Sequence, residues 1–135
     1  MLKLAFRLGT SDHGVSAVEF ALVAPVLLMT LLGAIDFGRM FYLRQGLEYA
    51  AQAGARYYVL NTTAASSVVT AYVQSKVPGV SGSSVTVDVV DTPSCNGSPQ
   101  VTCSTITATV GFAFTGFIPI RPLTLRASAQ AVRLL

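Results

Sequence analysis

Side chains capable of acid–base chemistry are few in this sequence of 135 residues. It contains six Asp and Glu residues, one His and two Cys. Asp88 and Asp91 have no evident partner acid or base in the sequence, so we expect both to be solvated at a strand edge. The sequence also lacks a glycine-rich phosphate loop and clustered metal ligands. It therefore argues against an enzyme and predicts no cofactor, metal or small-molecule substrate.

The two cysteines, Cys95 and Cys103, bracket the segment NGSPQVT. Asn96-Gly97 is a strong turn signal that brings strand ends together, so we predict a disulfide between the cysteines. Such a bond would place this part of the chain in an oxidising compartment. Two free thiols in a cytosolic domain are the alternative. Zinc is disfavoured because it needs four ligands and His13 is distant in the sequence.

One carboxylate, Glu19, stands directly before a long apolar run. The run FALVAPVLLMTLLGAI extends from Phe20 to Ile35 without a charge, and the segment from Val15 to Ile35 has the length of about 20 residues that a bilayer-spanning helix needs. A carboxylate at membrane depth is costly and favours a cationic partner. Alternatively, Glu19 lies near the helix N-terminus, where the helix dipole and lipid headgroups stabilise an acid.

Composition agrees with a membrane helix, because 52% of residues are hydrophobic and only 11% are charged. The mean hydropathy is +0.59. A buried core helix would need a larger fold around it. A cleaved signal peptide is the stronger rival, although Leu32-Gly33-Ala34 matches its small-x-small cleavage site only loosely. Pro25 is expected to bend the helix without ending it.

Charge decides little about orientation or partners. Lys3 and Arg7 before the apolar run are balanced by Arg39 and Arg44 after it. The net charge is +3, but the basic residues are scattered singly, which argues against a nucleic-acid partner. The predicted disulfide indicates a cytoplasmic N-terminus and an extracytoplasmic C-terminal part.

The spacing of Gly14, Val15, Glu19 and Phe20 resembles the class III prepilin processing motif of type IV and Flp-type pili. The resemblance implies that a membrane-embedded prepilin peptidase cuts after Gly14, whose small size lets the backbone enter a protease cleft. The cut would leave a free amine on Val15, one helical turn from Glu19. It further implies that Glu19 pairs with the N-terminal amine of a neighbouring subunit.

A longer stretch, from Gly14 to about Tyr58, is similar to the TadE-like family. The pattern AVEFALVxPVLLxxLLGxxDFGRxFYxRQxLxxAAxxGAR carries this similarity. Members are described as minor pseudopilins of the tight-adherence (Flp pilus) machinery. The resemblance implies a protein of the bacterial inner membrane, with prepilin peptidase, other pilins, pilus assembly proteins and membrane lipid as partners. It leaves open whether the protein enters a surface pilus, and it does not extend past about residue 60.

The helix is expected to continue beyond the membrane. Asp36 and Arg39 have the i,i+3 spacing of a helix ion pair. An apolar stripe with small residues follows, exemplified by Leu47, Ala50 and Gly54. Small residues allow close approach of another element. Packing against a neighbouring subunit and packing onto the chain's own C-terminal domain are both open.

The C-terminal part is predicted to add one helix and a small sheet. Asn61-Thr62-Thr63 ends the first helix, and 64–77 forms a second. Alternating β-branched residues predict strands at 84–90, 101–114 and 124–132. We therefore expect an α+β, pilin-like fold with a leader at 1–14, a transmembrane and continuing helix at 15–60, and an extracytoplasmic head at 61–135. A permanent single-pass membrane protein and a secreted binding domain are the alternatives.

Overall fold

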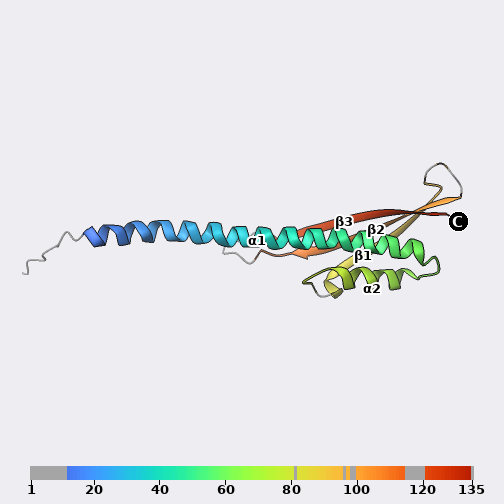
Figure 1. Cartoon of the computed structure of the whole chain (residues 1–135), viewed down its shortest axis with the longest axis horizontal. Coiled ribbons are helices and arrows are strands. Elements are labelled where there is room, and N and C mark those ends of the chain that lie inside the picture. The colour runs from blue at the N-terminus through green and yellow to red at the C-terminus, as the bar shows by residue number, and fades with distance from the viewer. Residues whose placement is uncertain (1–11, 81, 96, 98–99, 115–120, 135) are drawn as a thin grey trace, which may run out of the picture. The chain divides into compact units, whose positions relative to one another are not determined.

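The computed structural model describes residues 12–80, 82–95, 97, 100–114 and 121–134. A long helix is followed by a short helix, one 3-10 turn and three strands (Figure 1). The elements are α1 (Asp12–Leu60), α2 (Ser66–Lys76), the 3-10 turn η1 (Gly82–Ser84), β1 (Val85–Pro93), β2 (Val101–Phe112) and β3 (Leu123–Leu134). The predicted α+β fold is confirmed.

The chain divides into two compact units, unit 1 at residues 1–35 and unit 2 at residues 36–135. Helix α1 contributes to both units. The part of α1 from Asp36 to Leu60 therefore belongs to the same compact unit as α2 and the sheet. The predicted domain limits at 14 and 60 stay predictions, and residues 1–11 of the expected leader lie outside the described residues.

Helix α1 ends where the sequence predicts, because Asn61 caps it. The backbone N–H of Asn61 donates to the Tyr57 carbonyl at 3.0 Å, and its side-chain amide donates to the same oxygen at 2.9 Å. These bonds satisfy a carbonyl that would otherwise lack a partner at the helix end. Helix α2 then leads into the sheet, where Gln74 Nε2 donates to the Val85 carbonyl at 2.9 Å.

The three strands form one antiparallel sheet in the order β1-β2-β3. Val85, Val110 and Leu125 occupy one cross-strand row, and alternate residues along each strand point to the same side. All but one of the strand limits differ from those predicted by one to three residues. Strand β1 begins at Val85 and continues to Pro93, β2 ends at Phe112 rather than Phe114, and β3 covers Leu123–Leu134 rather than 124–132.

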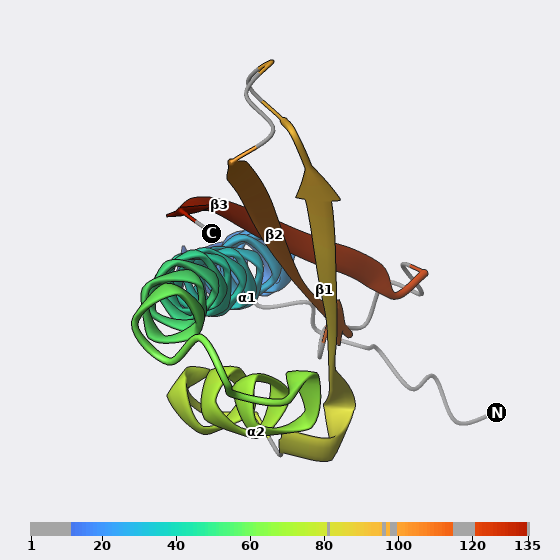
Figure 2. The ribbon, with the colours of Figure 1, turned by 90° about the vertical axis from the view of Figure 1, so that its right-hand side faces the viewer.

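The core of unit 2 lies between one face of this sheet and the two helices (Figure 2). Ile106 and Val110 in the central strand and Leu47, Val69 and Val73 in the helices are almost fully buried. Full burial of one such aliphatic side chain contributes about 1.5–3 kcal/mol. The remaining buried hydrophobic members are Leu43, Ala50, Ala51, Ala55, Tyr58, Val77, Val85, Ala108, Phe112, Leu125 and Ala127.

The small residues of α1 pack against other elements of the same chain. Ala50 and Ala51 are fully buried in the core of unit 2. At Gly54 there is no room for a side chain, because a Cβ atom would collide with the Val73 side chain and lie 3.6 Å from Ile106 Cδ1. Of the two open alternatives for the stripe, packing onto the chain's own C-terminal part is the one observed.

Two glycines of α1 allow a matched test of this packing. Both substitutions to Ala gain helix propensity, worth up to about 1 kcal/mol. Gly38→Ala meets no atom within 4 Å and should leave the free energy of unfolding unchanged or raise it. Gly54→Ala should instead lower it by about 1–2 kcal/mol, because overpacking a core costs more than the propensity gained. Denaturant titration of both variants in detergent checks this, and equal stability would contradict the close contact.

Candidate functional site

The apolar segment Val15–Ile35 presents its large side chains to the surroundings. Their exposed fractions range from 40% at Leu32 to 72% at Leu22. In the described part of the chain, α1 holds a window with mean hydropathy 2.2 and none of it buried, and the helix is long and apolar enough to cross a membrane. Water-soluble proteins rarely expose apolar patches beyond several hundred Å². Lipid or another protein must therefore cover this surface. One such helix near the N-terminus fits a single-pass membrane protein.

The residues of the predicted processing and assembly motif lie in the first turns of α1. Gly14, Val15, Glu19 and Phe20 are helical and exposed, with exposed fractions of 70% at Val15 and 71% at Phe20. The helix continues through Pro25. Nothing in this chain covers the Glu19 carboxylate within the described residues, so a partner from outside can reach it.

Asp36 and Arg39 meet at the start of unit 2. Arg39 Nη1 lies 3.4 Å from Asp36 Oδ1, which is the i,i+3 contact that their spacing predicts. The Asp36 side chain is only 9% exposed, whereas the Arg39 side chain is 58% exposed. Because water reaches the guanidinium group, the attraction between the two charges is screened, and the ion pair contributes little to stability. Its main consequence is that a buried carboxylate is compensated.

Aromatic rings gather at this end of unit 2, in a group that we call the aromatic collar: Phe37, Phe41, Tyr42, Phe112 and Phe114. Phe37 and Phe114 pack edge to face, with ring centroids 6.2 Å apart. Phe112 and Phe114 pack edge to face at 5.1 Å. The collar thus joins α1 to the end of β2. Sequence reasoning missed it, because residues 37 and 114 are far apart in the chain.

The collar borders a groove with a cavity volume of about 460 Å³. Helix α1 supplies Arg39, Tyr42 and Leu43 to its wall. The other lining residues come from the connection after α2 and from the end of β2: Pro78, Gly79, Val80, Gly111, Phe112 and Ala113. Arg39 lies over the Phe112 ring, with its guanidinium carbon 6.0 Å from the ring centroid. The groove thus combines apolar side chains with polar groups, among them the Arg39 guanidinium.

A polar cluster ties the end of α1 to the sheet. The Tyr58 hydroxyl donates a hydrogen bond to Asp91 Oδ2 at 2.8 Å. Arg133 covers the Tyr58 ring at 5.2 Å and donates from Nη2 to the Thr62 carbonyl at 3.1 Å. Asp91 is exposed on β1, an edge strand of the sheet, as expected, but it does have a partner, because folding brings Tyr58 beside it. Asp88 points to the opposite side of the strand and is exposed, as expected.

The predicted disulfide between Cys95 and Cys103 is present, with the two Cα atoms 5.7 Å apart. It closes the turn between β1 and β2. Gly97 N–H donates to the Ser94 carbonyl at 3.2 Å, and Gly97 adopts a φ of 74° that suits glycine. Asn96, the other residue of the predicted turn signal, lies outside the described residues. Among the described residues, no group of three or more His, Cys, Asp or Glu could hold a metal ion.

The polar cluster predicts a loss of stability at high pH. The hydrogen bond to Asp91, together with burial and the Asp91 charge, raises the pKa of Tyr58 above its usual value, and Arg133 opposes the shift. The folded protein holds the phenol proton more tightly than the unfolded chain. This stabilisation is full below about pH 10 and is lost as pH rises through the raised pKa.

Unfolding titrations at several pH values up to about 11 test this prediction. The free energy of unfolding should fall less steeply with pH in Tyr58→Phe than in the wild type. Tyr49→Phe is the control, because Tyr49 is 62% exposed, and it should retain the wild-type pH dependence. Identical slopes in all three proteins would contradict the role of the Tyr58 proton.

Comparison with known proteins addresses the N-terminal part of the chain. Residues 14–56 match the model of a protein family described as TadE-like protein. Neither a curated protein nor a solved structure matches the chain. The resemblance predicted from the sequence is confirmed over the matched residues, which begin at Gly14. The TadE-like family is typically non-enzymatic and associates with pilus proteins. Residues 14–56 of this chain are thus similar to TadE-like proteins, and this similarity suggests a protein associated with the tight-adherence (Tad) pilus.

Proposed function

We propose that this protein is a minor pseudopilin that a prepilin peptidase cleaves after Gly14. In this proposal the segment Val15–Ile35 holds the mature subunit in the bacterial inner membrane and later packs against other pilins during assembly of a Flp (tight-adherence) type pilus. The observation that carries the proposal is the exposure of this apolar segment within the TadE-like match. One surface then serves two environments, lipid before assembly and protein after it.

The internal packing of α1 supports a restricted assembly surface. Ala50, Ala51, Gly54 and Ala55 already pack inside unit 2, so a neighbouring helix cannot use them without unfolding that core. The segment Val15–Ile35 has no comparable partner among the described residues of this chain. Subunit contacts through α1 are therefore expected along this segment.

The chemistry of Glu19 gives the assembly step its specificity. The segment from Ser16 to Ile35 spans about 30 Å as a helix, the thickness of the hydrocarbon core, which sets Glu19 near the edge of that core. A carboxylate there is stabilised by a cation. Cleavage after Gly14 would supply one as the free amine of Val15. Pairing with the amine of a neighbouring subunit would fix the register of the two helices.

The disulfide supports the orientation. Disulfides persist in oxidising compartments, so unit 2, which contains the Cys95–Cys103 bond, is proposed to lie outside the cytoplasm. The N-terminus would then be cytoplasmic, on the side where prepilin peptidase acts. This arrangement makes the bond after Gly14 accessible while the apolar segment stays in the bilayer.

Processing is tested by the mass of the N-terminal peptide from membranes of cells with and without their prepilin peptidase. We expect a start at Val15 only when the peptidase is present. Gly14→Phe should accumulate the uncleaved form, because a bulky side chain hinders entry of the extended backbone into the protease. Gly9→Phe, at the other glycine of the leader, is the matched control and should be cleaved normally.

Each other outcome of the same experiment identifies a rival. A start near Ile35 would mean that the apolar segment is a discarded signal peptide of a secreted domain. An intact Met1 in both strains would indicate a permanent single-pass membrane protein. Either result would remove the pseudopilin assignment while leaving the fold of unit 2 unaffected.

Glu19→Val should leave membrane insertion intact and reduce incorporation into pili. Loss of a charge-assisted contact worth about 1.5–3 kcal/mol corresponds to a decrease of roughly 10- to 100-fold in association. Ser16→Val in the same helix turn is the control and should be incorporated at the wild-type level. Quantitative immunoblots of sheared pili and of membranes measure both. If Glu19→Val is incorporated at the wild-type level, Glu19 has no role in assembly and is only an acid at the membrane interface.

A further inference from the structure

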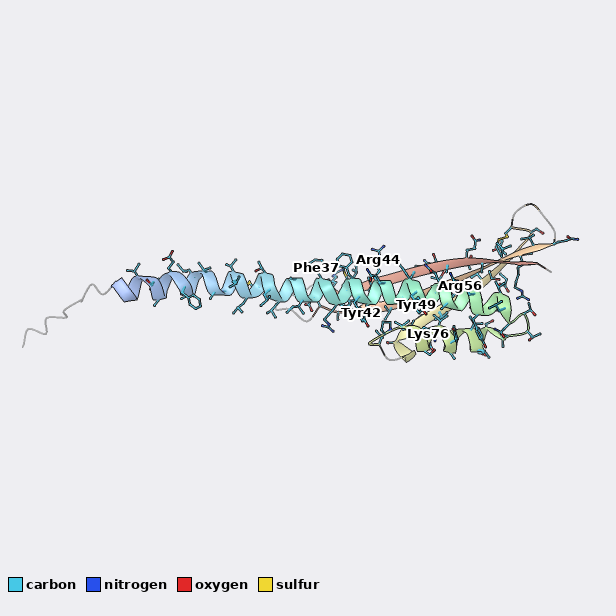
Figure 3. All side chains as sticks on the ribbon, in the orientation of Figure 1. Phe37, Tyr42, Arg44, Tyr49, Arg56 and Lys76 are labelled. Atoms are coloured by element: carbon cyan, nitrogen blue, oxygen red, sulfur yellow. A yellow bond between two sulfur atoms is a disulfide. The ribbon has the colours of Figure 1, made fainter. Side chains whose placement is uncertain are left out.

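The disulfide and the polar cluster lie at neighbouring positions of the sheet. Cys103 in β2 is the cross-strand partner of Thr92 in β1. The next pair along the two strands joins Ser104 to Asp91, whose carboxylate accepts the hydrogen bond from the Tyr58 hydroxyl. Figure 3 shows the disulfide as a yellow bond at the end of the β1–β2 hairpin. The covalent link is therefore one residue along β2 from the residue that faces this acceptor.

The same part of β2 also faces the other residue that contacts Tyr58. On the side of β3, Thr102 is the cross-strand partner of Arg133. Arg133 covers the Tyr58 ring, with its guanidinium carbon 5.2 Å from the ring centroid. Cys103 thus lies between the two β2 residues, 102 and 104, whose cross-strand partners hold the end of α1.

This end of the sheet needs a link because the strands stop there. The pairing of β1 with β2 ends two residues beyond Asp91, at Pro93. Terminal pairs open more readily than central ones. In the turn itself, the Gly97 N–H donates to the carbonyl of Ser94, and Ser94 has a φ of 55°, which is unfavourable for a residue with a Cβ atom. A covalent bond across this turn keeps the last cross-strand pairs closed.

We propose that the disulfide positions Asp91: it closes the hairpin at the adjacent pair, keeps the carboxylate beside the Tyr58 hydroxyl, and so couples the redox state of the cysteines to the attachment of α1. In thiol–disulfide exchange the two cysteine thiols give up two protons and two electrons to a second disulfide, which becomes two thiols. A dithiol reductant reverses the step. The coupling lies within unit 2 alone and requires neither membrane insertion nor pilus assembly.

A double-mutant cycle with the full chain in detergent tests this coupling. Tyr58→Phe is measured with the disulfide present and in a chain that carries Cys95→Ser and Cys103→Ser. The effect of the disulfide on the unfolded chain cancels, because it is the same with Tyr and with Phe at position 58. We expect Tyr58→Phe to lower the equilibrium constant for folding about fivefold with the disulfide, as loss of an ordinary hydrogen bond does, and less than about twofold without it.

Gln74→Leu is the matched control. Gln74 Nε2 donates to the Val85 carbonyl at 2.9 Å, so this variant also removes one hydrogen bond between a helix and β1. Val85 is about 20 Å along the strand from Asp91, and distant sites contribute additively. Gln74→Leu should therefore have the same effect in both backgrounds. If Tyr58→Phe also has equal effects in both, the disulfide stabilises only by constraining the unfolded chain, and the proposal is overturned.

The titration of Tyr58 gives a second readout, which a general loss of stability does not change. The hydrogen bond to Asp91 is the main cause that raises the pKa of Tyr58. In the folded chain without the disulfide, this pKa should fall toward the usual value of about 10. Spectra of ring-labelled tyrosine measure it, and the signal of Tyr49, which is 62% exposed and labelled in Figure 3, should be the same in both proteins. A Tyr58 pKa that stays raised would contradict the positioning role.

If the chain without cysteines does not fold, reduction of the native disulfide measures the same coupling. Coupling between two sites is reciprocal, so Tyr58→Phe should raise the ratio of reduced to oxidised protein about fivefold at a fixed concentration of dithiol reductant. Gln74→Leu should raise this ratio less than about twofold. Equal shifts in the two variants would overturn the proposal, because the disulfide would then depend on the fold as a whole.

Discussion

Helix α1 is continuous, but its two parts bury apolar side chains differently. The part up to Ile35 needs lipid or another protein around it, whereas the part from Asp36 packs one face against its own chain. In lipid each backbone N–H and C=O must be satisfied within the segment, which leaves the helix as the available structure for one spanning segment. Apolar residues there can point in every direction. From Asp36 onward only one face is buried, against the sheet and α2, and the other faces carry Arg44, Glu48 and Tyr49.

The change from the exposed apolar segment to the part of α1 that packs on the sheet occurs at Asp36, the first residue of unit 2. Its carboxylate is buried and contacts Arg39, so the first polar group of the core is compensated locally. Beyond it, small residues permit α1 to approach its neighbours closely: a Cβ atom added at Gly54 would collide with the Val73 side chain of α2. The polar cluster around Tyr58 holds the last turn of α1 against β1 and β3. The part of α1 that belongs to unit 2 is thereby joined to α2 and β2 near Gly54 and to β1 and β3 near Tyr58.

This division has a functional consequence. The face of α1 with the small residues, which by sequence could serve a neighbouring subunit, is occupied within the chain. The apolar segment before Asp36 stays exposed among the described residues. The TadE-like match covers both parts, 14–56, and stops before α2 and the sheet. The matched region thus contains the exposed apolar segment and the core residues that α1 supplies up to residue 56.

By itself the sequence determined the features that depend on neighbours along the chain. The apolar run, the i,i+3 pair at Asp36, the end of α1 at Leu60 and the alternating strands all follow from local spacing, and the Cys pair from a short turn. Only the tertiary structure decided which face of α1 is occupied, that Asp91 receives the Tyr58 hydroxyl, and that Phe114 packs on Phe37. These contacts join residues that are far apart in the chain, and the same local pattern is compatible with several partners. Their choice depends on how the sheet and helices pack together, and the pattern of any one segment does not contain that information.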